Sequence, residues 1–178
     1  MFKKILSFFF IITLFYQSTS YSKSNSLENF NSKDLSNYFS GIVAFENKKN
    51  TEALKFFNSS KVLLNQHNPY LKRYITALVL ENKVPQAINI VSKNKNKKNI
   101  DFFEAYLLLI LDSLKKNNIE KAYEDLKIAF TFAEQGRFNS AILETLNEYI
   151  FVFKEKKLLN EKNNFGNLTI ITETFQKC

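Results

Sequence analysis

The chain of 178 residues carries 25 lysines and arginines against 17 acidic residues, a formal net charge of +8, and 45% of its residues are hydrophobic. Three glycines and two prolines are few for a turn-rich β fold, so the composition favours long helices. The single cysteine excludes an internal disulfide framework. A basic surface attracts anionic partners, but along most of this chain the lysines alternate with acids.

The first residues have the features of an export signal. Two lysines at positions 3 and 4 precede an apolar run over 5–16, which is too short to cross a hydrocarbon core that needs roughly 20 residues. Small polar residues follow, so residues 1–20 are predicted to be a secretory signal peptide and the protein to be periplasmic or secreted. The alternative is an uncleaved segment that keeps the protein at a membrane. Residues 21–31, rich in serine and asparagine, are predicted to form a flexible leader.

Four helices are predicted in the first half of the remaining chain. Ser32 is a suitable N-cap for a helix over 33–47, and Asn50 for a second helix that ends near residue 66. Pro69 and Pro85 each begin a further helix, ending near residues 81 and 92, because proline at the first helical position wastes no hydrogen bond. The turn over 81–85 is interpreted as one residue shorter than the turn over 46–51, which shifts the register of the second pair.

The second half is predicted to be helical as well. Residues 102–111 contain one charged residue, Glu104, and are expected to form a central helix that is covered on several sides. Asn118 caps a partner helix over 119–135, and Gly136 is expected to be the left-handed residue that ends it. Within that helix Glu124 and Asp125 are interpreted as surface charge. A long helix over 139–160 and an apolar segment over 168–176 make residues 136–178 a cap or a degenerate fourth repeat, and the chain is interpreted as the front part of a longer array.

Three helix-opening phrases recur at a nearly constant step. Their alanines, at positions 53, 87 and 122, are 34 and 35 residues apart, a period typical of solenoids built from helix–turn–helix units. Short side chains at such positions let two antiparallel helices approach closely. The pattern resembles the tetratricopeptide repeat family, and the positions that match its packing residues are Gly41, Ala53, Phe57, Ser60, Ala87, Val91, Ala122, Leu126 and Ala129.

The resemblance implies an all-α, right-handed solenoid of about three antiparallel helix pairs with a C-terminal capping helix. The repeats occupy residues 32–135, divided near 34–67, 68–98 and 99–135. The resemblance also implies a non-catalytic module that docks a partner protein or peptide on its concave face, which the first helix of each unit lines. Carried over by position, the docking residues are Tyr38, Ile42, Phe45, Arg73, Tyr74, Leu107, Leu111 and Leu114.

Two alternatives stand beside this hypothesis. Tyrosine and arginine are common among interface hot spots, but plain core packing also explains apolar and aromatic stripes at helical spacing. The chain is alternatively a structural arm, or the N-terminal fragment, of a larger exported assembly.

No residue set for catalysis, for a cofactor or for a metal emerges from the sequence. His67 is the only histidine and stands in a turn without a second ligand nearby. Cys178, the last residue, has no base beside it, and there is no glycine-rich phosphate motif. One basic stretch is interpreted as a solvated loop, or as a weak contact to anionic membranes; its lysines are Lys93, Lys95, Lys97 and Lys98. Nucleic-acid binding is not expected there, because no aromatic residues are interleaved with them.

Overall fold

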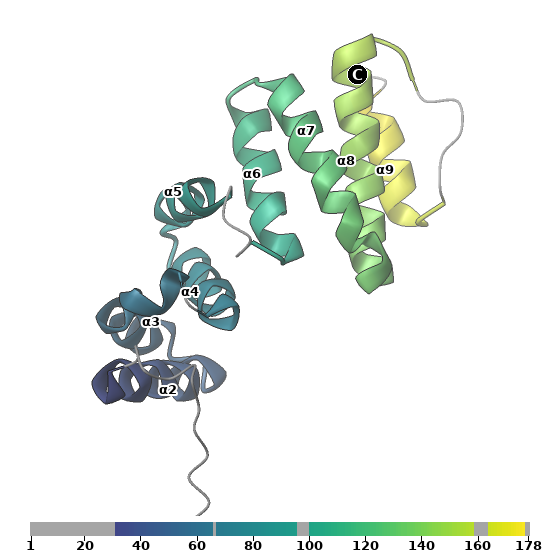
Figure 1. Ribbon diagram of the computed structural model, residues 1–178. Helices are drawn as coiled ribbons and strands as arrows, with labels where there is room; N and C mark the ends of the chain where they lie inside the picture. Colours follow the sequence, from purple (N-terminus) through teal and green to yellow (C-terminus); the bar gives the residue numbers. More distant parts are fainter. Residues whose placement is uncertain (1–30, 66, 96–99, 159–163, 177–178) are drawn as a thin grey trace, which may run out of the picture. The chain divides into compact units, whose positions relative to one another are not determined.

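The computed structural model of the chain describes residues 31–65, 67–95, 100–158 and 164–176, and this part is helical, without a strand (Figure 1). The all-α class predicted from the sequence is therefore confirmed for these residues. The α-helices are α2 (Ser32–Glu46), α3 (Asn50–Ser59), α4 (Asn68–Leu80), α5 (Val84–Asn94), α6 (Phe103–Lys115), α7 (Ile119–Ala129), α8 (Arg137–Glu155) and α9 (Asn167–Gln176). Two short 3₁₀ segments, η1 (Lys61–Asn65) and η2 (Phe130–Gln135), follow α3 and α7. The predicted signal peptide and nearly all of the predicted leader lie outside the described residues.

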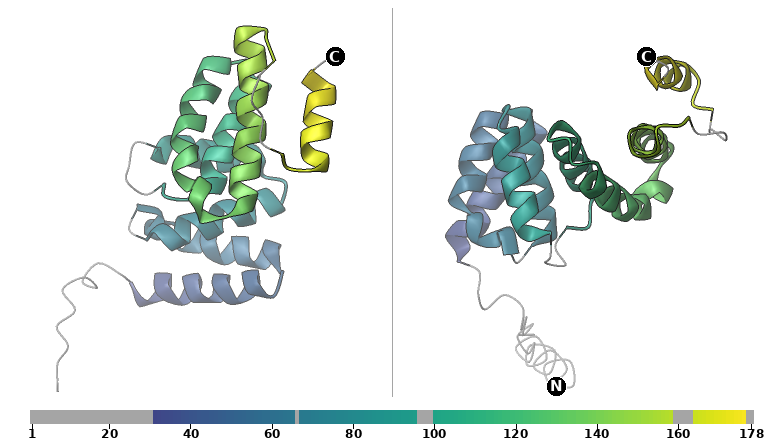
Figure 2. Two further views of the ribbon diagram at one scale, coloured as in Figure 1. Left: turned by 90° about the vertical axis from the view of Figure 1, so that its right-hand side faces the viewer. Right: turned by 90° about the horizontal axis from the view of Figure 1, so that it is seen from above.

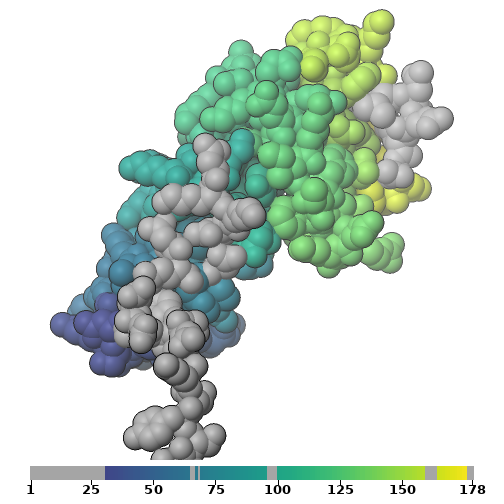
Figure 3. Space-filling model, viewed as in Figure 1, coloured from purple at the N-terminus to yellow at the C-terminus, as the bar shows by residue number. Residues whose placement is uncertain are grey.

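Helices that are neighbours in sequence are neighbours in space. The helices α2 and α3, α4 and α5, α6 and α7, and α8 and α9 pack as pairs, and α3, α5 and α7 each also contact the helix that opens the next pair (Figures 1 and 2). In the space-filling view the atoms of neighbouring helices touch, and the colours succeed one another in sequence order across the visible face (Figure 3). The core is therefore made mostly of contacts between elements close in sequence.

The turns within the first three pairs share one backbone structure. Lys48, Asn82 and Asn117 adopt left-handed conformations, with φ of 60°, 57° and 56°. In each turn the next residue donates its N–H to a carbonyl five residues back: Lys49 to Ala44, Lys83 to Leu78, and Asn118 to Ser113, at 2.9, 2.8 and 2.9 Å. This is the Schellman arrangement, which satisfies carbonyls that the end of a helix leaves unpaired. The turn residues are 34 and 35 positions apart, the same steps as the alanines.

The expected shorter turn in the second pair is therefore wrong. The sequence comparison aligned Glu81 with Glu46, whereas the hydrogen bonds align Glu81 with Asn47, because each stands immediately before a left-handed residue. The helices of the second pair keep the register of the first.

Small residues stand where paired helices meet. Ala53, Ala87 and Ala122 are completely buried, and a methyl group placed on Gly41 of α2 would come within 2.6 Å of the Phe57 ring on α3. Close approach of helices requires short side chains at such points. Every position matched to the family's packing residues is buried, namely Gly41, Ala53, Phe57, Ser60, Ala87, Val91, Ala122, Leu126 and Ala129.

An aromatic cluster joins the first pair to α4. The Phe57 ring on α3 lies 6.3 Å from Tyr38 of α2, 5.8 Å from Tyr70 of α4 and 6.5 Å from Tyr74 of α4, between ring centroids. Such separations suit offset and edge-to-face contacts between rings. The Tyr38 ring of α2 also lies 5.5 Å from the Tyr70 ring of α4, so the cluster joins α2, α3 and α4 directly.

The structure corrects two local predictions and confirms a third. The second helix ends at Ser59 rather than near residue 66, because the Ser60 hydroxyl donates to the Phe56 carbonyl and the Tyr70 hydroxyl donates to the Phe57 carbonyl. These side chains take acceptors that a continuing helix would use. Gly136 has a φ of 166°, which is extended rather than left-handed, and it precedes α8 as its N-cap residue. Asn118, as predicted, caps α7: its side-chain oxygen accepts from the Lys121 N–H at 3.2 Å.

Candidate binding groove

A groove of about 560 Å³ lies where α4 meets the beginning of α6; we call it the α4–α6 groove. Its lining comes from α4, from the residues that open α6, from the end of α2 and from the end of η2. The lining residues are Phe45, Pro69, Lys72, Arg73, Thr76, Asp101, Phe102, Glu104 and Gln135.

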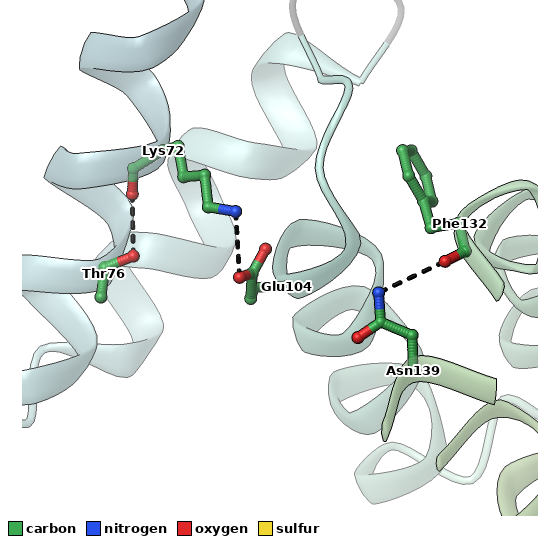
Figure 4. Close-up of polar contacts among 5 residues, drawn as sticks. All are labelled: Lys72, Thr76, Glu104, Phe132 and Asn139. Carbon is green, nitrogen blue, oxygen red and sulfur yellow. Dashed lines mark hydrogen bonds and ion pairs between the residues drawn. The ribbon is translucent and has the colours of Figure 1, made fainter. Parts of the chain in front are cut away.

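The two sides of the groove carry opposite charges. Lys72 extends from α4 toward Glu104 on α6, with 3.1 Å between Nζ and Oε1, and this pair and the neighbouring α4 residue Thr76 are shown in Figure 4. The Lys72 ammonium also lies 5.8 Å from the centre of the buried Phe102 ring. Both charged side chains are about half exposed, at 50% and 49%. An exposed pair of this kind contributes about 1 kcal/mol or less, so a ligand can separate it at little cost.

Arg73 stands beside that pair in a different environment. Its Nη1 donates to the Tyr38 hydroxyl at 3.3 Å, and the same hydroxyl lies 3.2 Å from His67 Nε2. None of the ion pairs among the described residues involves Arg73. A guanidinium carries five N–H donors, so this half-buried side chain keeps donors for an acidic or carbonyl group in the groove.

Burial and the Arg73 charge also affect the neighbouring titratable groups. Burial lowers the pKa of His67 below its ordinary value, and the nearby Arg73 charge lowers it further. Burial raises the pKa of Tyr38, an effect that Arg73 partly offsets. Tyr38 and His67 are therefore neutral near pH 7, so the Arg73 guanidinium carries the charge among these three side chains.

On the opposite side of the groove, η2 is anchored to α8. Asn139 Nδ2 donates to the Phe132 carbonyl at 3.3 Å, as Figure 4 shows. The Phe132 ring packs 5.7 Å from the Tyr106 ring of α6. These contacts fix η2, and with it Gln135 at the edge of the groove.

The residues nominated for docking from the sequence do not share one surface. Phe45 and Arg73 line the α4–α6 groove. Tyr38 and Tyr74 are buried, at 4% and 0% exposure, and the Tyr74 hydroxyl donates to Asn58 Oδ1 at 2.7 Å. Core packing, the alternative interpretation, accounts for both tyrosines in this structure.

The other nominated residues lie on α2 and α6. Ile42, Leu107 and Leu114 are half-buried. Leu111 is 47% exposed and lines a separate groove of about 610 Å³ between α5 and α6. The structure therefore does not bring the α6 leucines to the α4–α6 groove.

Sequence reasoning missed Lys72, Thr76 and Phe102. The first two occupy, in the second pair, the positions that Tyr38 and Ile42 occupy in the first, as the equivalent turns show. An alignment that matches the left-handed turn residues, instead of Glu46 and Glu81, places Lys72 and Thr76 on the docking face. Phe102 is the N-cap residue of α6, and the equivalent position before α4 is His67, a different type of residue, so the repeat pattern does not indicate a phenylalanine there.

The basic stretch between α5 and α6 is only partly described. Lys93 is exposed, while Lys95 forms an ion pair with Asp125, whose carboxylate is completely buried. Lys95 is therefore engaged within the fold, and the membrane contact of this stretch stays a prediction. The interpretation of Asp125 as surface charge is wrong. Lys97 and Lys98 lie outside the described residues.

Comparisons with protein-family models, with curated protein sequences and with solved structures find no match for this chain. Within the described residues, no helix combines the length and the hydropathy that a membrane crossing requires, and no three histidine, cysteine or acidic side chains gather closely enough to hold a metal ion.

Proposed function

We propose that this chain is an exported, non-catalytic scaffold of the tetratricopeptide-like solenoid class, which binds an extended segment of a partner protein in the α4–α6 groove. The repeated Schellman turns, 34 and 35 residues apart, support the solenoid part of the proposal. The equally spaced buried alanines support it independently. Export rests on the basic and apolar N-terminal residues of the sequence.

The observation that carries the binding proposal is the chemistry of the groove. Phe45, Pro69 and Phe102 provide apolar surface, while Lys72 and Arg73 on one side oppose Asp101 and Glu104 on the other. Binding sites typically combine an apolar lining with a few polar groups that fix orientation. A peptide segment fits this arrangement if an apolar side chain contacts the phenylalanines and an acidic group reaches Arg73.

The ion pair across the groove is the part that a ligand would rearrange. Lys72 and Glu104 are half exposed and contribute little to stability. A partner protein that places an acidic group beside Lys72 and a hydrogen-bond donor beside Glu104 replaces the ion pair with two new contacts. Neither charged side chain is then left unpaired. Charge complementarity of this kind contributes more to the orientation and specificity of a complex than to its raw affinity.

A test combines site-specific crosslinking with a charge exchange. A photoreactive amino acid replaces Thr76 in the groove or, as a control, the exposed Thr131 on η2. The double variant Lys72→Glu/Glu104→Lys keeps the ion pair but reverses the polarity of the groove. A matched control exchanges the pair Glu120 and Lys154, which is separated by 3.2 Å.

We expect crosslinks to a defined partner from the exported fraction at Thr76 and not at Thr131. The groove exchange should abolish these crosslinks and the control exchange should leave them unchanged, with the same circular dichroism for all variants. Equal crosslinking at both positions would refute the groove. Crosslinks at Thr76 that survive the groove exchange would favour the rival hypothesis, a structural arm held by other surfaces.

A further inference from the structure

Helix α9 presents its apolar side to solvent. It packs against α8, with Thr172 buried to 1% exposure, while Ile170, Ile171 and Phe175 are 64%, 51% and 67% exposed. At 100° per residue these three side chains and Thr174 fall within one arc of about 140°, on the side of α9 away from the half-buried Thr169 and Glu173. A surface helix normally buries its apolar side. The reversed polarity of α9 indicates that this side contacts something other than α8.

A second apolar surface lies on α2. A groove of about 740 Å³ runs between α2 and α3; we call it the α2–α3 groove. Phe39 and Val43 line it and are 59% and 62% exposed, with the half-buried Phe56 beside them. A terminal unit of a helical stack normally has a polar outer face, because an exposed apolar end associates. The α2–α3 groove has polar residues in its lining, but the two large apolar side chains of Phe39 and Val43 are exposed among them.

The contacts within the chain show which kind of element suits this groove. The second helix of each pair packs against the first helix of the next pair: α3 against α4, α5 against α6, and α7 against α8. Among the described residues, α9 is the second helix of the pair that it forms with α8, and α2 is the first helix of the pair that it forms with α3. Placing α9 of one copy against α2 of another repeats a contact that the fold already makes three times.

The charges of the two surfaces allow this contact between like-charged molecules. Copies of the chain repel each other, because the formal charge is +8 with residues 1–20 and 23 − 17 = +6 without Lys3 and Lys4. The exposed side of α9 carries Ile170, Ile171, Thr174 and Phe175, none of them charged. The α2 side of the groove carries Ser36, Phe39, Ser40, Val43 and Asn47, also uncharged. The charged residues of the lining, Lys49 and Glu52, are 3.6 Å apart and neutralise each other.

We propose that copies of this chain associate head to tail, with the apolar side of α9 seated in the α2–α3 groove of the next copy. The two surfaces differ, so the contact is heterologous and generates rings or open filaments rather than a closed symmetric dimer. Added salt strengthens the association, because it screens the repulsion between the copies while the contact itself is apolar.

Two variants isolate the two surfaces. Val43→Asp places a charge in the α2–α3 groove, and Ile171→Asp places one on α9. Both positions are at least half exposed in the single chain, so neither change should alter the fold, which circular dichroism and thermal unfolding check. The control is Leu80→Asp, an equally exposed leucine on α4, at 54%. The full chain, as its host cells process it, is studied by sedimentation velocity and by light scattering over a range of concentrations.

The wild type and the Leu80 variant should form assemblies larger than dimers with rising concentration, and each interface variant should need at least tenfold higher concentration. A mixture of the Val43 and Ile171 variants should form a dimer and nothing larger, because it retains one intact α9 side and one intact groove. A wild type that stays monomeric, association that survives either substitution, or a mixture that forms no dimer would each overturn the proposal and assign these surfaces a different occupant.

Discussion

Replacement of Gly41 by alanine sets two effects of comparable size against each other. Gly41 lies inside α2, where alanine is favoured over glycine by about 1 kcal/mol. The added methyl group, however, would stand 2.6 and 2.7 Å from two carbons of the Phe57 ring, against an optimum of about 3.5–4.0 Å. The ring is fully buried among Tyr38, Tyr70 and Tyr74 and has little room to move.

The steric effect should win. Extra carbon in a packed core typically costs about 1–3 kcal/mol, and the surrounding rings place this site in the upper part of that range. The net loss is then about 1–2 kcal/mol after the gain in helix propensity. For a chain of this size, the melting temperature should fall by about 2–8 °C. Urea unfolding followed by circular dichroism measures the free energy of unfolding directly.

Two controls separate packing from propensity. Ser36→Ala, on the exposed side of α2, should be neutral or stabilising by up to about 0.5 kcal/mol. In a Phe57→Leu background the methyl group has no ring to meet, so Gly41→Ala should cost at least about 1 kcal/mol less than in the wild type. If Gly41→Ala stabilises the wild type by its full helix propensity, or costs the same in both backgrounds, the close approach of α2 and α3 at Phe57 is refuted.

Three further changes test other features. Lys48→Gly should stabilise the fold by about 0.5–1 kcal/mol in urea unfolding, because glycine adopts the left-handed φ of 60° without the strain of a Cβ. Lys95→Met should cost about 3–5 kcal/mol, because it leaves the buried Asp125 carboxylate without its partner. Between pH 7.5 and 5.5 the wild type should lose stability as the pH falls, because burial and Arg73 lower the pKa of His67 in the folded chain and the unfolded chain therefore binds the proton more readily. His67→Gln should make this loss of stability smaller.

Neighbouring lysines provide the controls for the first two changes. Lys49 has an ordinary φ of −88° and is the N-cap residue of α3, where glycine is tolerated, so Lys49→Gly should change the stability by no more than about 0.3 kcal/mol. Lys93 is exposed, so Lys93→Met should be nearly neutral. Equal effects at positions 48 and 49, or at 93 and 95, would contradict the turn geometry and the buried ion pair. A pH dependence unchanged by His67→Gln would contradict the linkage to that histidine.

The helices were predictable because they depend on local chemistry. Proline at the start of α4 and α5, an asparagine cap before α7, and alanines at a constant step are signals within single turns of the chain. The end of α3 was not predictable in this way. It depends on the Tyr70 hydroxyl, which comes from the following helix and donates to the Phe57 carbonyl. The type of each element thus followed from local sequence, whereas the end of α3 depends on a contact with another helix.

Asp125 shows the same limit for charge. Its spacing, three residues after Ala122 and four before Ala129, places it on the packing side of the helix and Glu124 on the other, but nothing in that stretch shows the partner that a buried carboxylate needs. The structure buries Asp125 completely because Lys95, at the end of α5, reaches it from the preceding pair. A carboxylate is tolerated in a core only with such a partner, and the partner is 30 residues away.

The groove was the least predictable feature, because equivalent positions in the repeat differ in exposure. Tyr38, Lys72 and Leu107 occupy the same place relative to the shared turns. Tyr38 is buried against Phe57 and His67, Lys72 is exposed and crosses to Glu104, and Leu107 is half-buried. The period determines which side of a helix a residue occupies, but the neighbouring pair determines whether that side is covered. A binding surface made of several pairs therefore depends on how successive pairs are rotated against each other, which the spacing of alanines does not specify.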